Sequence, residues 1–307
     1  MPGRTTVEIT VLQHQNPFPK RPERVVVMGA AGFVGAELVK KLTSRDISVL
    51  ALSRRDIDLL TPDAGVRLAA LLRPDDVFVA AAARAPCKNI EMLVENMKIV
   101  AALFNALTKS PVAHIVNISS DAVYADSSSP LTEESTMAPD TLHGVMHLAR
   151  ELAFRHEVRT PLAMLRPSLL YGAADPHNGY GPNRFRRLAN EGQDILLFGE
   201  GEERRDHVLI DDVAELIVRV IERRSVGTLN IATGRVHSFR EVAELVMSRA
   251  PNKVAIKCSP RSGPMPHNGY RPFDSSATRT AFPDFQYTPL QEGLARAQRE
   301  QVRAGNA

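Results

Sequence analysis

The sequence predicts an α/β fold, a doubly wound parallel sheet with a smaller discontinuous C-terminal unit. Short runs of β-branched and alanine residues alternate with amphipathic stretches, a glycine triplet follows the first run, and a Gly- and Pro-rich segment interrupts the alternation after Tyr171. Apolar strands separated by helical segments are typical of a parallel sheet covered on both faces. The predicted strands are residues 25–28, 48–52, 77–81, 114–118 and 163–166.

Composition excludes several classes of function. The 307 residues are 44% apolar and 24% charged, which is ordinary for folded globular units. A net charge of +3, with both signs spread along the chain, leaves no basic stripe for nucleic acid. The apolar run at residues 25–36 is far shorter than the roughly 20 residues that span a membrane. With no signal-peptide core and only Cys87 and Cys258, we expect a cytoplasmic protein.

The first segment is expected to stand apart from the sheet. Residues 7–12 suit one short strand, and residues 16–22 contain three prolines, which favour an extended connector. We therefore expect residues 1–22 to form an N-terminal appendage.

The first strand of the sheet is followed by a glycine turn and then by a helix with apolar residues at helical spacing. Gly29 permits a tight turn, Gly32 lets backbone amides approach a pyrophosphate at the helix N-terminus, and Gly35 lets the helix pack closely on the strand. This order predicts a dinucleotide site that includes Phe33 and Val34. The alternative is a merely structural glycine turn.

The end of the second strand bears on which dinucleotide binds. An acidic residue about 20 positions after the glycines would hold the adenosine ribose of NAD, but this strand ends in Ser53 and Arg54. These side chains suit a 2′-phosphate, so the sequence favours NADP over NAD. The alternative is that Arg54 and Arg55 are solvated loop cations.

The glycine turn and further motifs along the chain resemble those of the extended short-chain dehydrogenase/reductase family. This family contains nucleotide-sugar epimerases, dehydratases and ketoreductases. The resemblance runs from about residue 24 to the final helix and includes Ser120 four residues before Tyr124, the segment 199–212 and Arg271. The resemblance implies a Rossmann domain, a nucleotide-sugar substrate and, because dimers are usual in the family, a homodimer. The further cofactor-contacting residues that it implies are Asp58, Leu59, Ala81, Ala82, Asn96 and Pro167.

Beyond Tyr171 the sequence predicts a second unit interleaved with the first. A loop over 171–182 is followed by a helix at 212–222, a strand at 228–231, a helix at 238–248 capped by Ser238 with Glu241 at the capping-box position, and a last helix from Pro289. We expect residues 23–171 plus 205–236 to form the dinucleotide-binding domain. Residues 172–204 plus 237–307 are expected to form the substrate-binding domain.

The family's catalytic Tyr, and the Lys four residues after it, correspond here to His143 and His147. An imidazole has an unperturbed pKa near 6.5, which suits proton transfer at neutral pH. His143 is therefore the candidate acid/base, His147 the candidate ribose ligand, and Ser120 the group that polarises the substrate oxygen. The two histidines are expected beside an apolar helical stripe made of Leu142, Val145, Met146, Ala149, Leu152 and Ala153.

Other uses of the two histidines stay open. One is a catalytically silent protein that binds the dinucleotide and acts as a sensor or partner subunit. Another is zinc, because His at i and i+4 on one helix face can chelate it. The sequence offers no obvious third ligand, so we expect no metal.

The resemblance also implies substrate contacts. Arg205 and Arg271 match positions where the family's arginines bind a diphosphate; the alternative is an ion pair such as Arg205 with Asp211. Asp121 follows Ser120, but Ala122 stands where dehydratases place a second acid, so epimerisation or ketone reduction is favoured over dehydration. Leu169 replaces a frequent substrate-binding Asn. Tyr180 and Asn183 lie on the loop expected over the sugar, while His177 and His207 are expected to be loop or surface residues.

Overall fold

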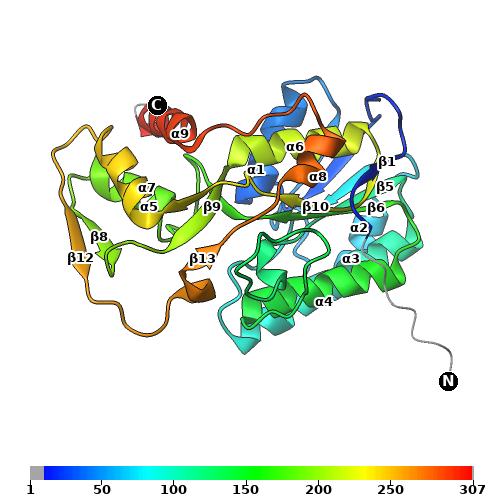
Figure 1. Cartoon of the computed structure of the whole chain (residues 1–307). Helices are drawn as coiled ribbons and strands as arrows, with labels where there is room; N and C mark the ends of the chain where they lie inside the picture. Colours follow the sequence, from blue (N-terminus) through cyan, green and yellow to red (C-terminus); the bar gives the residue numbers. More distant parts are fainter. Residues whose placement is uncertain (1–9, 306–307) are drawn as a thin grey trace.

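The large sheet is parallel apart from one edge strand, as the alternating pattern predicts. The computed structural model describes residues 10–305, and its strands lie in the order β1-β10-β6-β5-β4-β2-β3 (Figure 1). The fold class and the five predicted strands are confirmed, with shifts of one residue at some ends. The strands are β1 (Gln13–His14), β2 (Val25–Met28), β3 (Val49–Leu52), β4 (Val77–Ala80), β5 (His114–Ile118), β6 (Leu162–Pro167) and β10 (Ser225–Ile231).

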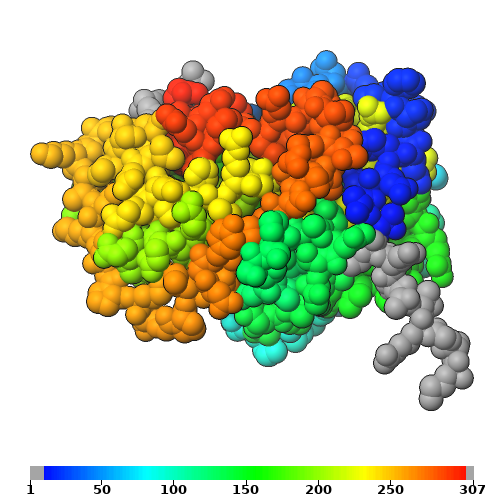
Figure 2. Space-filling view, in the orientation of Figure 1, coloured from blue at the N-terminus to red at the C-terminus, as the bar shows by residue number. Residues whose placement is uncertain are grey.

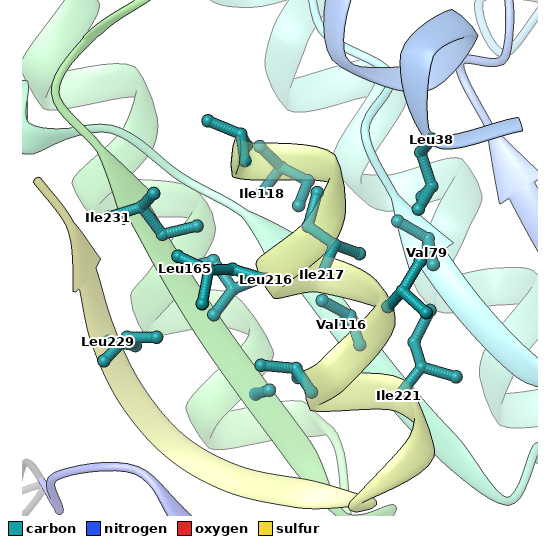
Figure 3. Close-up of a cluster of buried hydrophobic side chains, with 14 of the residues drawn as sticks. Leu38, Val79, Val116, Ile118, Leu165, Leu216, Ile217, Ile221, Leu229 and Ile231 are labelled. Carbon is teal, nitrogen blue, oxygen red and sulfur yellow. The ribbon is translucent and has the colours of Figure 1, made fainter. Parts of the chain in front are cut away.

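Helices cover both faces of this sheet. One face carries α1 (Phe33–Thr43) and α6 (Ile210–Glu222); the other carries α2 (Ala64–Ala69), α3 (Ile90–Lys109) and α4 (Leu142–Glu157) (Figure 1). Leu216, Ile217 and Ile221 of α6 pack against β4, β5 and β6 through buried aliphatic side chains (Figure 3). Burying apolar surface on both faces is what holds a parallel sheet together.

The N-terminal segment pairs with the sheet. β1 runs antiparallel to β10, and the Leu12 N–H donates to the carbonyl oxygen of Thr228 at 2.9 Å. The strand expected at residues 7–12 lies partly outside the described residues, and its described part forms one isolated bridge at Val11. The regular pairing is at residues 13–14, so the described part of the expected appendage is an edge of the large sheet.

The second unit is smaller and discontinuous. It has a four-stranded sheet, a two-stranded sheet and a separate apolar core (Figure 1). The predicted capping box of Ser238 and Glu241 is present, and the last helix starts at Leu290, next to the predicted Pro289. Its elements are β7 (Leu169–Tyr171), α5 (Pro182–Asn190), β8 (Ile195–Phe198), β9 (Arg204–Leu209), β11 (Val236–Ser238), α7 (Phe239–Met247), β12 (Ile256–Ser259), β13 (Tyr270–Arg271) and α9 (Leu290–Gly305).

A segment near the C-terminal end of the chain passes back between the two units. Residues 270–281, drawn in orange, lie between the green part of the first unit and the yellow part of the second (Figure 2). The short helix α8 (Ser276–Ala281) packs beside β10 of the large sheet. Arg271 and α8 therefore tie the second unit to the first.

The apolar stripe predicted for α4 is wrong. Val145 and Leu152 are 39% and 38% exposed, whereas the helix buries His147, Arg150 and Glu151. Arg150 and Glu151 are buried because the ends of β4, β5 and β6 supply hydrogen-bond partners that the helix pattern does not reveal.

Among residues 10–305, no helix has both the length and the hydropathy needed to cross a membrane.

Candidate active site

A cleft of about 930 Å³ opens over the carboxyl ends of the large sheet and extends to the second unit. Its walls come from the glycine turn, the ends of β4, β5 and β6, the start of α4, and β9. The predicted site residues that line it are Gly32, Phe33, Val34, Gly35, Ala81, Ser120, Asp121, His143, His147, Pro167, Tyr180, Asn183, Arg205 and Arg271.

The glycine turn has the shape that a dinucleotide pyrophosphate needs. Gly29 has a φ of +100°, and a Cβ there would lie 2.6 Å from the backbone nitrogen of Ala82. A Cβ on Gly35 would overlap the carbonyl oxygen of Gly29. Gly32 caps α1 without a side chain, so the first amides of this helix are open to an anion in the cleft. These residues fit a bound dinucleotide.

The residues at the end of β3 bind one another. The Ser53 N–H and Oγ both donate to Asp56, at 2.8 and 2.7 Å, and these bonds lower the pKa of that carboxyl. Arg54 pairs with Asp58 at 3.0 Å and stays 69% exposed. Leu59 is buried behind them. A 2′-phosphate would therefore compete with two carboxylates for Ser53 and Arg54.

The loop after β4 is held by Asn96 rather than left free. The Asn96 amide accepts from the Arg84 N–H at 2.9 Å and donates to the Arg84 and Met92 carbonyls at 3.0 and 2.8 Å. With its polar atoms engaged by the protein, Asn96 shapes the loop that carries Ala81 and Ala82, and it does not line the cleft.

His143 and His147 both line the cleft. Their rings are edge-to-face with centroids 4.7 Å apart, and the Cys87 N–H donates to Nδ1 of His143 at 3.4 Å. Burial lowers the pKa of His143 and places that of His147 well below its ordinary value. Both rings are therefore neutral at pH 7, and Nδ1 of His147 is buried without a hydrogen-bond partner.

The start of α4 is held against the Ser120 segment by sterics. Thr141 caps the helix through the Gly144 N–H, and a Cβ on Gly144 would overlap the carbonyl oxygen of Ala122. This contact brings His143 beside Ser120, whose hydroxyl accepts from the Ala122 N–H at 3.2 Å and donates to Asp121 at 3.3 Å. The predicted trio of Ser120, His143 and His147 therefore shares one cleft.

Both predicted phosphate-binding arginines are buried and already paired. Arg205 lies 2.6 Å from Glu203, and its Nη1 is buried without a partner. The alternative pair with Asp211 is not formed, since Asp211 binds Arg296. Arg271 lies 3.0 Å from Asp121 and joins β13 to the first unit.

Tyr180 and Asn183 also have their polar atoms engaged. The Tyr180 hydroxyl accepts from the Phe198 N–H at 3.0 Å, and its ring packs against the rings of Phe185 and Phe239. Asn183 accepts from the Gly172 N–H and donates to the Leu170 carbonyl, each at 3.1 Å. In this state both residues fix the wall beneath the 171–182 loop.

His207 is a cleft residue that the sequence analysis placed wrongly at the surface. It lies on β9, is 3% exposed, and neither ring nitrogen has a partner. Burial lowers its pKa to about 3. Residues 204–209 were not predicted as a strand. They form β9, which pairs with β11, β13 and β7 and is buried along most of its length, and recognising this strand would have predicted a buried His207.

Within residues 10–305, no group of three or more His, Cys, Asp or Glu side chains is arranged to hold a metal ion.

Comparisons with known proteins find relatives and similar folds. The chain is 25% identical over 280 residues to a dTDP-4-dehydro-6-deoxy-D-allose reductase of Streptomyces bikiniensis, across 77% of this chain and 84% of that protein. The UDP-glucose 4-epimerase of Thermus thermophilus, solved with NAD, has a TM-score of 0.78 at 22% identity, covering 91% and 99% of the two chains. The UDP-N-acetylglucosamine 4-epimerase of Methanobrevibacter ruminantium, solved with UDP-N-acetylmuramic acid, has a TM-score of 0.80 at 19% identity, covering 93% and 99%. At these identities the structural likeness shows a shared fold.

The family match extends over most of the elements described above. Residues 25–232 match the NAD dependent epimerase/dehydratase family, a stretch that includes the glycine turn, the Ser120 segment and β9. The chain belongs to the NAD-dependent epimerase/dehydratase family.

Proposed function

We propose that this chain is an NAD(P)-dependent enzyme that epimerises or reduces the sugar of a nucleotide sugar, with His143 as an atypical acid/base. The observation that carries the proposal is the single cleft that joins the glycine turn to Ser120, His143 and the buried arginines. The relatives named above, which are a reductase and epimerases of nucleotide sugars, support the substrate class.

The dinucleotide end of the cleft is built from backbone. Gly29, Gly32 and the first turn of α1 bind the pyrophosphate, and His147 binds the nicotinamide ribose through its unpartnered Nδ1. When bound, the dinucleotide accepts or donates the hydride. NADP is favoured over NAD, because Ser53 and Arg54 bind a 2′-phosphate once they leave Asp56 and Asp58.

His143 handles the proton. Because the Cys87 N–H donates to Nδ1, the neutral ring carries its own proton on Nε2, which hydrogen-bonds to the oxygen at the reacting carbon. Full transfer of a proton to that oxygen starts from the imidazolium form, so that the ring is left neutral. Taking a proton at Nε2 needs the other tautomer, which gives up the long contact with Cys87. Ser120 donates to the same oxygen when it turns from Asp121.

The substrate end binds the diphosphate through Arg205 and Arg271, with Asp121, Tyr180 and Asn183 beside the sugar. Nη1 of Arg205 is buried and unpartnered, so it can donate to a phosphate oxygen without leaving Glu203.

The proposal keeps the two-unit organisation. Residues 23–171 plus 205–236 bind the dinucleotide, residues 172–204 plus 237–307 bind the substrate, and residues 1–22 are the N-terminal appendage. The separate apolar core supports a division into two units, and it also takes in Tyr171 and Leu209, so the boundary strands β7 and β9 pack with the second unit. Exposed apolar side chains on the outer helices support a homodimer; these are Ile90, Val94, Val145 and Leu152 on α3 and α4. A cytoplasmic location fits the two free cysteines.

A second function is a catalytically silent dinucleotide-binding protein that acts as a sensor or partner subunit. It is favoured by the neutral state of both histidines, because neither supplies the cation that the family's lysine supplies.

Redox exchange distinguishes the two functions. We expect the bound nicotinamide to change between oxidised and reduced forms when UDP-, dTDP- or GDP-sugars are added, as followed by its absorbance. The control variant His143→Ala should bind the dinucleotide without this exchange. Dinucleotide binding with no exchange for any sugar in the wild-type protein would support the silent function instead.

A further inference from the structure

Arg150 is a fully buried cation next to the cleft. It lies on α4, one turn after His147, and is 1% exposed. Its guanidinium donates to the Asn117 side chain at 2.6 Å and to the carbonyls of Ala82 and Ala80 at 2.6 and 2.7 Å. Three short bonds fix this group in one orientation across the ends of β4 and β5.

No carboxylate compensates this charge among the residues that the structure describes around it. Arg166, which is equally buried, lies 2.6 Å from Glu151, and that ion pair raises the pKa of Arg166. Burial alone acts on Arg150, lowering its pKa to about 10, which leaves it protonated at neutral pH. A buried and unpaired cation is costly unless a negative charge approaches it.

The guanidinium lies just behind the wall of the dinucleotide cleft. The two carbonyls that it binds flank Ala81, which lines the cleft, and the backbone of Ala82 touches the turn at Gly29. His147, which also lines the cleft, is on the same helix face, and its pKa is lowered first by burial and then by the neighbouring His143 and Arg150. The cation of this region is therefore at position 150 and not at position 147.

We propose that Arg150 is the positioning residue that supplies the fixed positive charge of the dinucleotide site, acting through the cleft wall in place of a cation at position 147. This inference rests on the dinucleotide site proposed above. The anionic dinucleotide compensates the charge. The oxidised nicotinamide ring is cationic and the reduced ring is neutral, so a fixed cation favours the reduced form over the oxidised form.

The test compares Arg150→Met, which keeps much of the side-chain volume, with Arg150→Lys, which keeps the charge. Dissociation constants for oxidised and reduced dinucleotide are measured by calorimetry. We expect Arg150→Met to weaken binding of both forms and to lower the preference for the reduced form by about threefold or more, while Arg150→Lys keeps that preference.

Two further variants separate charge from folding. Arg155→Met removes a second arginine of α4, which bonds Thr228 at 2.9 Å and lies 3.6 Å from Glu151, so the preference for the reduced form should not change. Arg150→Met with Asn117→Leu replaces the buried polar pair with apolar groups and is the variant to use if Arg150→Met does not fold.

A readout without dinucleotide keeps the inference separate from the proposed function. The imidazole of His147, identified by comparison with His147→Gln, is titrated by NMR. We expect its pKa to rise in either folded Arg150→Met variant and to stay low in Arg150→Lys. An unchanged titration and an unchanged preference for the reduced form would overturn the inference, as would an Arg150→Lys protein that behaves like Arg150→Met. A wild-type protein that binds no dinucleotide, but whose His147 titration still responds to position 150, would overturn the proposed function alone.

Discussion

The two ends of the cleft are built in different ways. The dinucleotide end consists of backbone packed against backbone, where Gly29 and Gly35 leave no room for a Cβ. The substrate end consists of long polar side chains, and most of these already bind one another, as Arg205 binds Glu203 and Arg271 binds Asp121. The glycine turn is therefore shaped before any ligand arrives, whereas most polar side chains of the second end are already bound to other side chains of the protein.

The largest effect should come from a methyl group at the dinucleotide end. In Gly35→Ala the new Cβ overlaps the carbonyl oxygen of Gly29, so α1 must move away from β2. We expect dinucleotide affinity to fall by more than about 100-fold, with a loss of about 3 kcal/mol in the free energy of unfolding. Calorimetry and denaturant unfolding measure the two effects. Gly179→Ala is the matched control, because no atom lies within 4 Å of its Cβ. An unaffected Gly35→Ala would show that this end is not rigid.

The next effect is on the rate of hydride transfer and concerns His143, which lies between the dinucleotide end and the substrate end. His143→Ala removes the proton donor while leaving the glycine turn intact, so the rate of hydride transfer should fall by about 100-fold with dinucleotide affinity retained. Single-turnover absorbance measures the rate. The complementary variant His143→Tyr with His147→Lys restores the family pair; gain of transfer in a protein that is inactive as found would favour the silent function. An unchanged rate in His143→Ala would remove the proposed mechanism.

A third effect is on stability, at the substrate end. Burial lowers the pKa of His207 to about 3, against about 6.5 in the unfolded chain. The unfolded chain binds more protons between these values, so the free energy of unfolding falls as pH drops below 6.5, by about 2 kcal/mol from this residue at pH 5. His207→Phe should reduce the loss of Tm between pH 7.5 and pH 5, whereas His156→Gln, on the exposed end of α4, should not. Equal losses in wild type and His207→Phe would argue against a neutral buried His207.

The substrate arginines should give a smaller change, because a carboxylate of the protein already neutralises each of them in part. Arg205→Ala removes one charge-assisted contact, so affinity for a nucleoside diphosphate should fall by about tenfold with little change for the dinucleotide. Calorimetry with UDP, dTDP and GDP measures this affinity. Glu203→Gln is the informative companion, since it removes the competing carboxylate and should strengthen diphosphate binding. Equal loss of both ligands would mean that the two ends are not independent.

The smallest effect is expected on cofactor preference, at the residues after β3 that would contact the adenosine part of the dinucleotide. Arg54 is 69% exposed and pairs with Asp58, so a 2′-phosphate gains little from it in water. Arg54→Ala should narrow the preference for NADPH over NADH by about threefold, as measured by calorimetry. Asp58→Asn, which frees Arg54, should widen it. Tighter binding of NADH by the wild-type protein would reverse the NADP assignment without affecting the fold.

The sequence by itself determined the large sheet, the glycine turn and the helix caps of this protein. These are local features: Val25–Met28 is apolar on both faces, Gly29 adopts a φ of +100°, and Ser238 bonds Glu241 three residues later. Each can be predicted because the residues that cause it are neighbours in the chain.

Only the tertiary structure decided the polar side of the site. Apolar spacing predicted the wrong face of α4, since Arg150 and Glu151 are buried through partners on β4, β5 and β6. The same holds for Arg205, which binds Glu203 and not Asp211, the partner offered as the alternative to a diphosphate, and for His207, which was predicted to be a loop or surface residue. A polar side chain is buried only where another segment compensates its lost hydration, and which segment does so depends on the fold as a whole.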